Sequence, residues 1–116
     1  MRTSVTRSFT FEAAHQLPWH EGRCRNLHGH GYRLEVTVAG PVGPHGIVAD
    51  FAEVAEVVRR AVVARYDHAY LNDLMANPTA ELVAHDAWKT LETAGLPVDR
   101  IRLWETDDCM VEVVPG

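Results

Sequence analysis

The chain has 116 residues and a formal net charge of −5, with 47% hydrophobic and 23% charged residues. This composition predicts one globular domain over residues 1–116 and excludes a disordered chain. The acidic charge argues against nucleic acid as a partner, and no segment approaches the roughly 20 apolar residues of a membrane helix. The start of the chain lacks the apolar stretch of a secretory signal, and two cysteines make no disulfide framework. We therefore expect a cytoplasmic protein with reduced thiols.

Alternating hydrophobic and polar residues predict two strands in the first third of the chain. Residues 3–15 alternate, with Phe11 on the apolar face, and residues 28–39 repeat the pattern with Tyr32 on that face. Between them, residues 16–27 contain proline and glycine and lose the alternation, which predicts a loop.

Two helices are expected next. Asp50 and Glu53 have the spacing of a capping box, and apolar residues at helical spacing continue to near Arg65. The second helix is predicted to begin at residues 77–79, and Gly95 is typical of its end.

Two short strands, at residues 99–106 and 109–114, close the chain. The order strand, strand, helix, helix, strand, strand predicts an α+β fold with an antiparallel sheet. Such a small sheet has exposed edges, and exposed edges must be covered or paired. Self-association is therefore expected.

Three histidines give the sharpest functional signal. His28 and His30 are two residues apart on a predicted strand, so their side chains point to the same side. His15 ends the preceding strand on its apolar face, where a histidine alone would favour an ordinary core residue. Three imidazoles with an open fourth position are typical of catalytic zinc, although imidazole also suits copper, nickel and iron. The three together indicate a metal site.

Cys24 lies four residues before His28, in the loop that leads to the predicted site. A nearby dication lowers the pKa of a thiol, which makes Cys24 a candidate base or nucleophile. It could instead be a fourth ligand that closes the metal site, or a buried apolar residue. Its position between Arg23 and Arg25 argues against burial.

Two further groups carry acidic side chains. Asp67 is adjacent to His68, and a carboxylate that orients an imidazole suits a proton shuttle, although this pair alone favours a surface loop. Glu105 falls on the apolar face of a predicted strand, where a carboxylate needs a partner or a function. It can hold the N–C–N edge of a guanidine-like ring by two parallel hydrogen bonds, or pair with a buried arginine such as Arg102 or Arg33.

Several short stretches, taken in order, span nearly the whole chain. They are Phe11-Glu-Ala-Ala-His15, Cys24-x-x-x-His28-Gly-His30-x-Tyr32, Asp50-Phe51, Asp67-His68-x-x-Leu71-Asn72, Asn77-Pro78-Thr79-x-Glu81 and Glu105-Thr106. Together they resemble the family of 6-pyruvoyl-tetrahydropterin and 6-carboxy-tetrahydropterin synthases. Each stretch is a weak signal by itself, whereas the ordered set is highly specific.

The resemblance implies a T-fold, in which a β-β-α-α-β-β subunit assembles through its sheets into a barrel. It also implies a homo-oligomer, usually a hexamer of two trimers, with active sites between subunits. Carried over by position, it implies zinc ligands at His15, His28 and His30, a general base at Cys24, a catalytic pair at Asp67 and His68, a pterin anchor at Glu105, and pterin contacts at Thr79 and Thr106.

The substrate class that the resemblance implies is 7,8-dihydroneopterin triphosphate. The spacing of Cys24 from the histidine pair is similar to the carboxy branch, which releases triphosphate and acetaldehyde and feeds 7-deazaguanine and queuosine synthesis. The segment after Glu105 looks partly like the pyruvoyl branch, which eliminates triphosphate and rearranges the side chain. We expect the carboxy product, with the pyruvoyl synthase and a non-catalytic metal-binding T-fold protein as alternatives.

Overall fold

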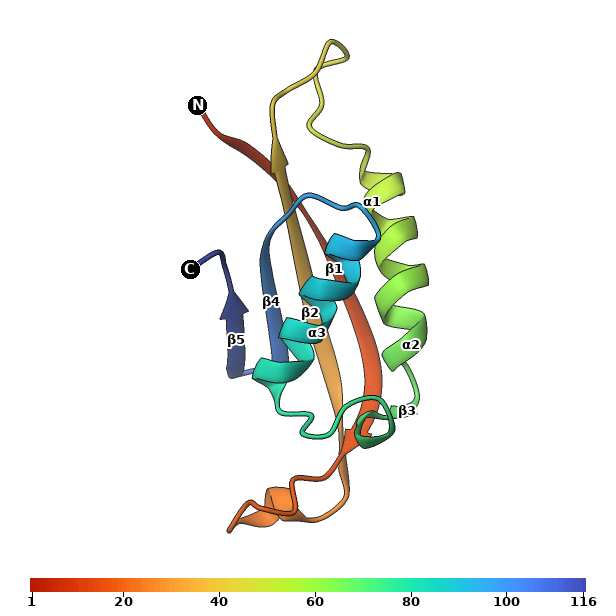
Figure 1. Cartoon of the computed structure of the whole chain (residues 1–116), viewed down its shortest axis with the longest axis vertical. Helices are drawn as coiled ribbons and strands as arrows, with labels where there is room; N and C mark the ends of the chain where they lie inside the picture. Colours follow the sequence, from red (N-terminus) through yellow and green to blue (C-terminus); the bar gives the residue numbers. More distant parts are fainter.

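A five-stranded sheet forms the body of the computed structural model, with the strand order β3-β1-β2-β4-β5 (Figure 1). The strands are β1 (Thr3–His15), β2 (His28–Gly40), β3 (Ala69–Tyr70), β4 (Val98–Thr106) and β5 (Cys109–Val113). The four long strands match the predicted ones to within a residue or two, which confirms the period-two interpretation. β3 was not predicted, because a strand of two residues has no periodicity to read.

The helices are α1 (Phe51–Val58), α2 (Ala64–Tyr66) and α3 (Ala80–Thr93). A π-helical segment, Arg59–Val63, joins α1 to α2, so the first predicted helix is interrupted rather than regular. The Asp50 side chain caps α1 by accepting from the N–H of Ala52. No helix combines the length and apolar character that a membrane span requires.

Strands β1 and β2 pair antiparallel along their whole length, and this register fixes the ends of both strands. His15 is the partner of His28, and Phe11 is the partner of Tyr32. β3 pairs parallel with β1, so the sheet is mixed and not purely antiparallel as predicted. β2 runs antiparallel to β1, and the helix from α1 to α2 then runs in the direction of β1, so the chain enters β3 parallel to β1 (Figure 1).

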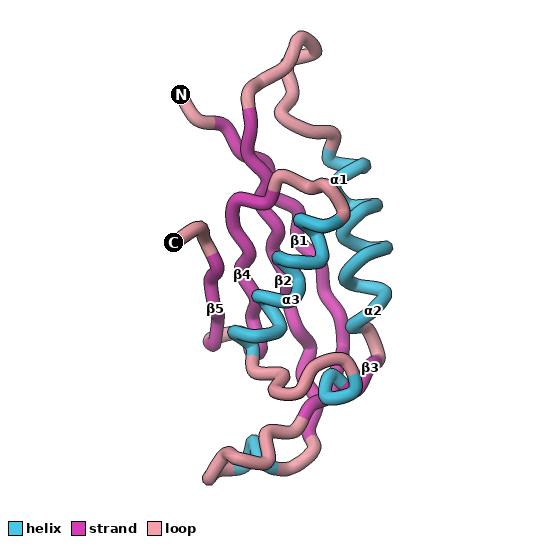
Figure 2. The backbone as a smooth tube through the Cα atoms, in the orientation of Figure 1, coloured by secondary structure: helices cyan, strands magenta, loops and turns pink.

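Both long helices cover the same face of the sheet, as Figure 2 shows. Alternate strand residues point into this layer and form one hydrophobic core with the helices. The opposite face carries no helix, and it presents polar side chains such as Thr10, Arg33 and Glu112. β5 forms one edge of the sheet, and β3 covers only Ala13 and Ala14 of the other edge.

Replacing Leu91 with alanine is expected to destabilise the chain by about 2–5 kcal/mol, because the truncation leaves a cavity. Leu91 is completely buried between α3 and the sheet. Leu82 lies on the same helix but is 43% exposed, so Leu82→Ala is the matched control, expected within about 0.5 kcal/mol of the wild type. Urea denaturation measures both values. Equal losses in the two variants would contradict the assignment of the core.

Candidate functional site

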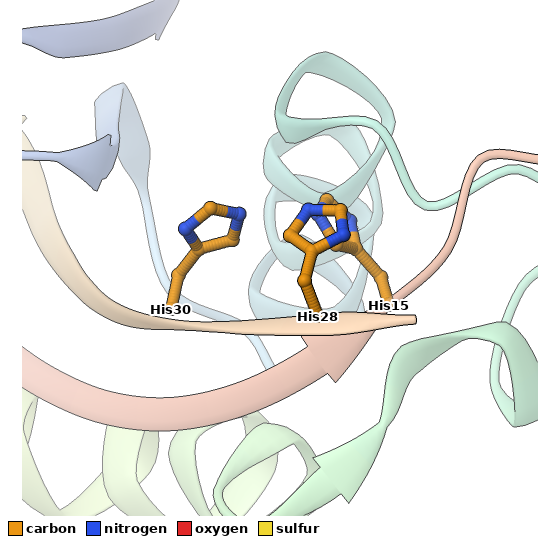
Figure 3. Close-up of side chains that lie close together, drawn as sticks. All are labelled: His15, His28 and His30. Carbon is orange, nitrogen blue, oxygen red and sulfur yellow. The ribbon is translucent and has the colours of Figure 1, made fainter. Parts of the chain in front are cut away.

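Three histidines converge at the end of the β1–β2 ladder (Figure 3). His15 ends β1, and His28 and His30 begin β2, so the antiparallel register brings the side chains to one place on the helix-covered face. The three ligand nitrogens all lie within 4.8 Å of one another. The predicted grouping of these three residues is therefore present in the structure, and the group could hold a metal ion.

Backbone carbonyls fix the proton positions of two of these rings. Nδ1 of His15 lies 2.8 Å from the carbonyl oxygen of Pro78, and Nδ1 of His28 lies 2.7 Å from that of Asn26. A carbonyl oxygen only accepts, so Nδ1 is the protonated nitrogen in both rings. Nε2 of each ring is then the nitrogen that remains for a cation, and these two Nε2 atoms are 2.9 Å apart. Two Nε2 atoms this close can share a cation, either a proton or a metal ion.

The third ring favours a metal ion over a shared proton. Nε2 of His30 is buried and has no hydrogen-bond partner. Burial lowers the pKa of His30, the Glu105 carboxylate opposes that change, and the rings of His15 and His28 lower the pKa further. The lowered pKa favours the neutral imidazole, and its Nε2 is not engaged by any partner in the chain. Two nitrogens are enough to share a proton, so a third nearby ring nitrogen is not needed for that purpose. A catalytic zinc site, in contrast, uses three protein ligand atoms.

Glu105 lies beside the three histidines and not beside an arginine. One carboxylate oxygen is 3.4 Å from Nε2 of His15 and 3.7 Å from Nε2 of His30. The alternative of an ion pair with Arg102 or Arg33 is not found, because those arginines pair with Glu35 and other carboxylates. The Glu105 side chain is 26% exposed, so its carboxylate can also reach a bound molecule.

Tyr32 forms the wall between the histidines and the hydrophobic core. Its ring stacks on Phe11, with centroids 5.0 Å apart, and contacts the His30 ring edge-on. Burial raises the pKa of the Tyr32 phenol well above its usual range, and the nearby Glu105 carboxylate adds to the effect. The phenol therefore stays protonated, and its buried hydroxyl has no partner within the chain.

Cys24 lies outside the group of mutually close metal ligands. It belongs to a short 3-10 turn, Arg23–Arg25, in the loop between β1 and β2, and its side chain is half-exposed. The geometry therefore does not show the closed four-ligand site that was one alternative for this cysteine. It is also not a fully buried apolar residue.

Asp67 and His68 contact each other directly after α2. Nδ1 of His68 lies 3.1 Å from a carboxylate oxygen of Asp67, and the same oxygen accepts the backbone N–H of Glu12 at 3.0 Å. The Glu12 N–H lowers the pKa of Asp67, and the hydrogen bond to His68 lowers it as well. His68 itself is 80% exposed, and its backbone has a positive φ of 60°. The side chains of these two neighbouring residues are therefore in contact.

His68 is not one of the three mutually close histidines of the same chain. It lines a pocket of about 360 Å³ together with Glu12, Ala14, Gly29, His30 and Gly31. Strand alternation assigns Glu12, Ala14, Gly29 and Gly31 to the face opposite His15, whereas His30 is a member of the metal-ligand group that also lines this pocket.

Thr79 and Thr106 have local structural partners. The Thr79 hydroxyl caps α3 by accepting the N–H of Leu82 at 3.2 Å. The Thr106 hydroxyl donates to Asp108 at 3.0 Å, at the turn between β4 and β5. Each threonine directly follows a residue of the site: Thr79 follows Pro78, and Thr106 follows Glu105. Their predicted contacts with a pterin stay predictions.

Some residues at the site were given no role by the sequence. Pro78 and Asn26 contribute backbone carbonyls, which no side-chain pattern can reveal. Asn72 binds the backbone directly after His15, through two hydrogen bonds to Gln16. Asn72 was part of a matching stretch, so its presence was a signal, but its partner was not readable from sequence.

The sequence profile described as 6-pyruvoyl tetrahydropterin synthase matches residues 4–115 of the chain. A 6-carboxy-5,6,7,8-tetrahydropterin synthase of Synechocystis sp. is 43% identical over 100 residues, which cover 80% of this chain and 78% of that relative. A dihydroneopterin monophosphate aldolase of Pyrococcus furiosus is 36% identical over 117 residues, which cover 97% of this chain and 98% of that relative.

A solved structure shows the same architecture. The 6-pyruvoyl tetrahydropterin synthase of Caenorhabditis elegans matches with a TM-score of 0.88, covering 100% of this chain and 97% of that chain, at 22% identity. Similarity at this level of identity establishes the fold. The predicted α+β T-fold is confirmed.

Proposed function

Because this chain belongs to the 6-pyruvoyl tetrahydropterin synthase family, we propose that it is a zinc-dependent 6-carboxy-5,6,7,8-tetrahydropterin synthase. In the proposed reaction, 7,8-dihydroneopterin triphosphate and one water yield 6-carboxy-5,6,7,8-tetrahydropterin, acetaldehyde and triphosphate. The observation that carries the proposal is the convergence of His15, His28 and His30 in a chain so similar to a protein of that name. The product would enter 7-deazaguanine and queuosine synthesis.

The three imidazoles fit zinc by number, charge and orientation. Two carry their proton on Nδ1, and the third has an unpaired buried nitrogen, so all three offer neutral donors to one centre. When bound, a zinc ion polarises the hydroxyl oxygens of the substrate side chain and acidifies the neighbouring carbon. The neutral ligand set leaves the full positive charge of the ion available for that task.

Proton transfer falls to Cys24, Asp67 and His68. The Cys24 thiolate removes a proton from the substrate side chain, and His68 carries a proton to or from the reacting group. Asp67 holds the imidazole through Nδ1 and directs Nε2 outward. The low pKa of Asp67 keeps it ionised, so it orients His68 and does not compete for the proton.

Glu105 is the proposed anchor of the pterin ring. A carboxylate accepts two parallel hydrogen bonds from the N–C–N edge of a guanidine-like ring. Its place beside the histidines would set the ring so that the side chain of the pterin points at the metal ligands. Thr79 and Thr106, which flank this region, are the proposed further contacts with the ring.

A complete site is proposed to need two copies of the chain. Within one chain, the His68 ring is 80% exposed, pairs with Asp67 and lies outside the metal-ligand group, so the His68 of a second copy would serve the histidines of the first. The exposed edges of β1 and β5 offer the surfaces for such assembly. We propose a homo-oligomer of the barrel type, usually a hexamer in this family.

Mixing two inactive variants is expected to restore activity. Oligomers assembled from equal amounts of Cys24→Ala and His68→Ala chains should recover about one quarter of the wild-type rate, because random mixing gives that share of sites an intact pair. Steady-state assays after joint refolding measure the recovery. A mixture of two separately folded, unexchanged oligomers is the control. No recovery after verified subunit exchange would show that each chain builds its site alone.

Mass spectrometry of the products is the direct test of the proposed reaction. Purified zinc-loaded protein is incubated with 7,8-dihydroneopterin triphosphate, beside the Cys24→Ala variant. A carboxy-tetrahydropterin together with acetaldehyde, both lost in the variant, would establish the carboxy reaction and the role of Cys24. A pyruvoyl product would keep the site and change the reaction assigned to it.

The Pyrococcus furiosus relative gives reason to test a second substrate. Its name describes an aldolase that acts on dihydroneopterin monophosphate. Incubation with that compound and detection of carbon–carbon cleavage would reassign the chain to this second activity. Bound metal without turnover of either substrate would favour a non-catalytic metal-binding protein.

A further inference from the structure

The loop between β1 and β2, to which Cys24 belongs, extends beyond the end of the sheet (Figure 1). Two backbone hydrogen bonds join residues within this loop. The Leu17 N–H donates to the Cys24 carbonyl at 2.8 Å, and the His20 N–H donates to the Leu17 carbonyl at 2.9 Å. Leu17 is only 7% exposed, whereas most of the loop is open to solvent. The position of the Cys24 backbone is therefore tied to that of Leu17.

Asn72 fixes the residue that precedes Leu17. Its side-chain oxygen accepts the Gln16 N–H at 2.9 Å, and its side-chain nitrogen donates to the Gln16 carbonyl at 2.8 Å. One amide side chain thus satisfies both backbone groups of Gln16, as a neighbouring strand would. This contact lies two residues beyond the pairing of Ala14 with Tyr70, so it continues the β1–β3 ladder after the strands end.

Asn77 holds the same loop at a second point. Its side-chain oxygen accepts the indole N–H of Trp19 at 2.8 Å. The next residue, Pro78, accepts Nδ1–H of His15 through its carbonyl oxygen. One short segment before α3 therefore contacts both a metal-ligand ring and the loop that carries Cys24.

We propose that Asn72 and Asn77 are positioning residues, which together hold the Cys24 loop in a fixed place relative to His15. The inference rests on the proposed role of Cys24 as the base. Neither asparagine side chain contacts a metal ligand ring or Cys24, so both act through the loop. A displacement of roughly 1 Å in a catalytic group can lower a rate by about 10²-fold, so two contacts of this kind are enough to matter.

The test uses Asn72→Ala, Asn77→Ala and Asn72→Asp in a Cys109→Ser chain, so that Cys24 is the only thiol. Amide hydrogen exchange, alkylation of Cys24 by iodoacetamide, kcat and KM are measured on the zinc-loaded protein. Asn72→Ala should raise the rate of amide exchange at Gln16 and Leu17, and the rate of Cys24 alkylation, each at least about 10-fold. It should lower kcat about 10-fold or more and leave KM nearly unchanged. Asp73→Ala, an exposed neighbour without side-chain partners, is the matched control.

The aspartate variant separates the two hydrogen bonds of Asn72. Asn72→Asp keeps the acceptor for the Gln16 N–H but places a carboxylate oxygen against the Gln16 carbonyl, so Gln16 should stay protected while Leu17 and Cys24 loosen. Unchanged exchange and alkylation in both alanine variants would overturn the proposal. Loss of protection throughout the core, including Val36, would show a merely structural role and would overturn it as well. Exchange and alkylation need no substrate, so these results stand even if the proposed reaction fails in the product assay.

Discussion

Replacing Cys24 with alanine is expected to lower kcat by about 10²–10⁴-fold, the range that a positioned general base contributes. Metal content and thermal stability should stay at their wild-type values, because Cys24 lies outside the group of metal ligands and is half-exposed. Stopped assays with the triphosphate substrate, metal analysis and a thermal melt on the same preparation measure all three quantities.

Cys109 provides the control for this variant. It is the other cysteine of the chain, it is exposed on β5, and it has no contact with the histidines. Cys109→Ser should therefore retain full activity. Loss of bound metal in Cys24→Ala would contradict the assignment of Cys24 as a base, and would return it to the role of a fourth ligand.

Replacing His30 with alanine is expected to abolish stable metal binding and, with it, turnover. His30 is the cleanest choice of the three ligands, because its Nε2 has no hydrogen-bond partner whose loss would confuse the result. Loss of a supporting partner of a ligand already costs about 10–100-fold in metal affinity, and loss of the ligand itself should cost more. Competition with a chromogenic chelator measures the affinity.

An exposed histidine on α3 serves as the matched control. His85→Ala removes an imidazole of the same chemistry at a distance from the ligand group, and should keep both metal and activity. Full activity of a metal-free His30→Ala protein would rule out metal-dependent catalysis at this site.

Acidification is expected to release the metal, since protons and metal compete for the same nitrogens. Because burial lowers the pKa of His30, that ring stays neutral to a lower pH than a free imidazole, whose pKa is about 6.5. Metal should thus remain bound at pH 7 and be lost only as the pH falls below the ordinary pKa of an imidazole. A titration of metal content against pH checks the direction, and release on raising the pH from neutrality would contradict it.

The sequence was sufficient for the long elements because each has its own period. The alternation in residues 3–15 and 28–39 predicted β1 and β2, and the antiparallel hairpin then required His15 and His28 to meet. The two-residue strand β3 and the π-helical segment Arg59–Val63 were missed, because neither leaves a periodic signal. Both depend on packing between parts of the chain far apart in sequence.

The metal-ligand group was predictable for the same reason, and the rest of the site less so. Asp67 and His68 contact each other in the structure, but the sequence alone could not tell that His68 lies outside the group formed by His15, His28 and His30. The proximity of Glu105 to His30 follows from the pairing of β2 with β4, which is a choice of tertiary structure. Asn72 acts on a backbone, and backbone partners have no signature in a list of side chains.

The left-handed backbone of His68 sets a limit on how the chain can be improved. A residue with a side chain at a φ of 60° is less stable than glycine would be there, although histidine tolerates the region better than most residues. A laboratory selection that rewards thermal stability alone would therefore favour glycine at this position. It would discard the imidazole that we propose carries the proton, so stability and turnover must be selected together in any engineered form of this enzyme.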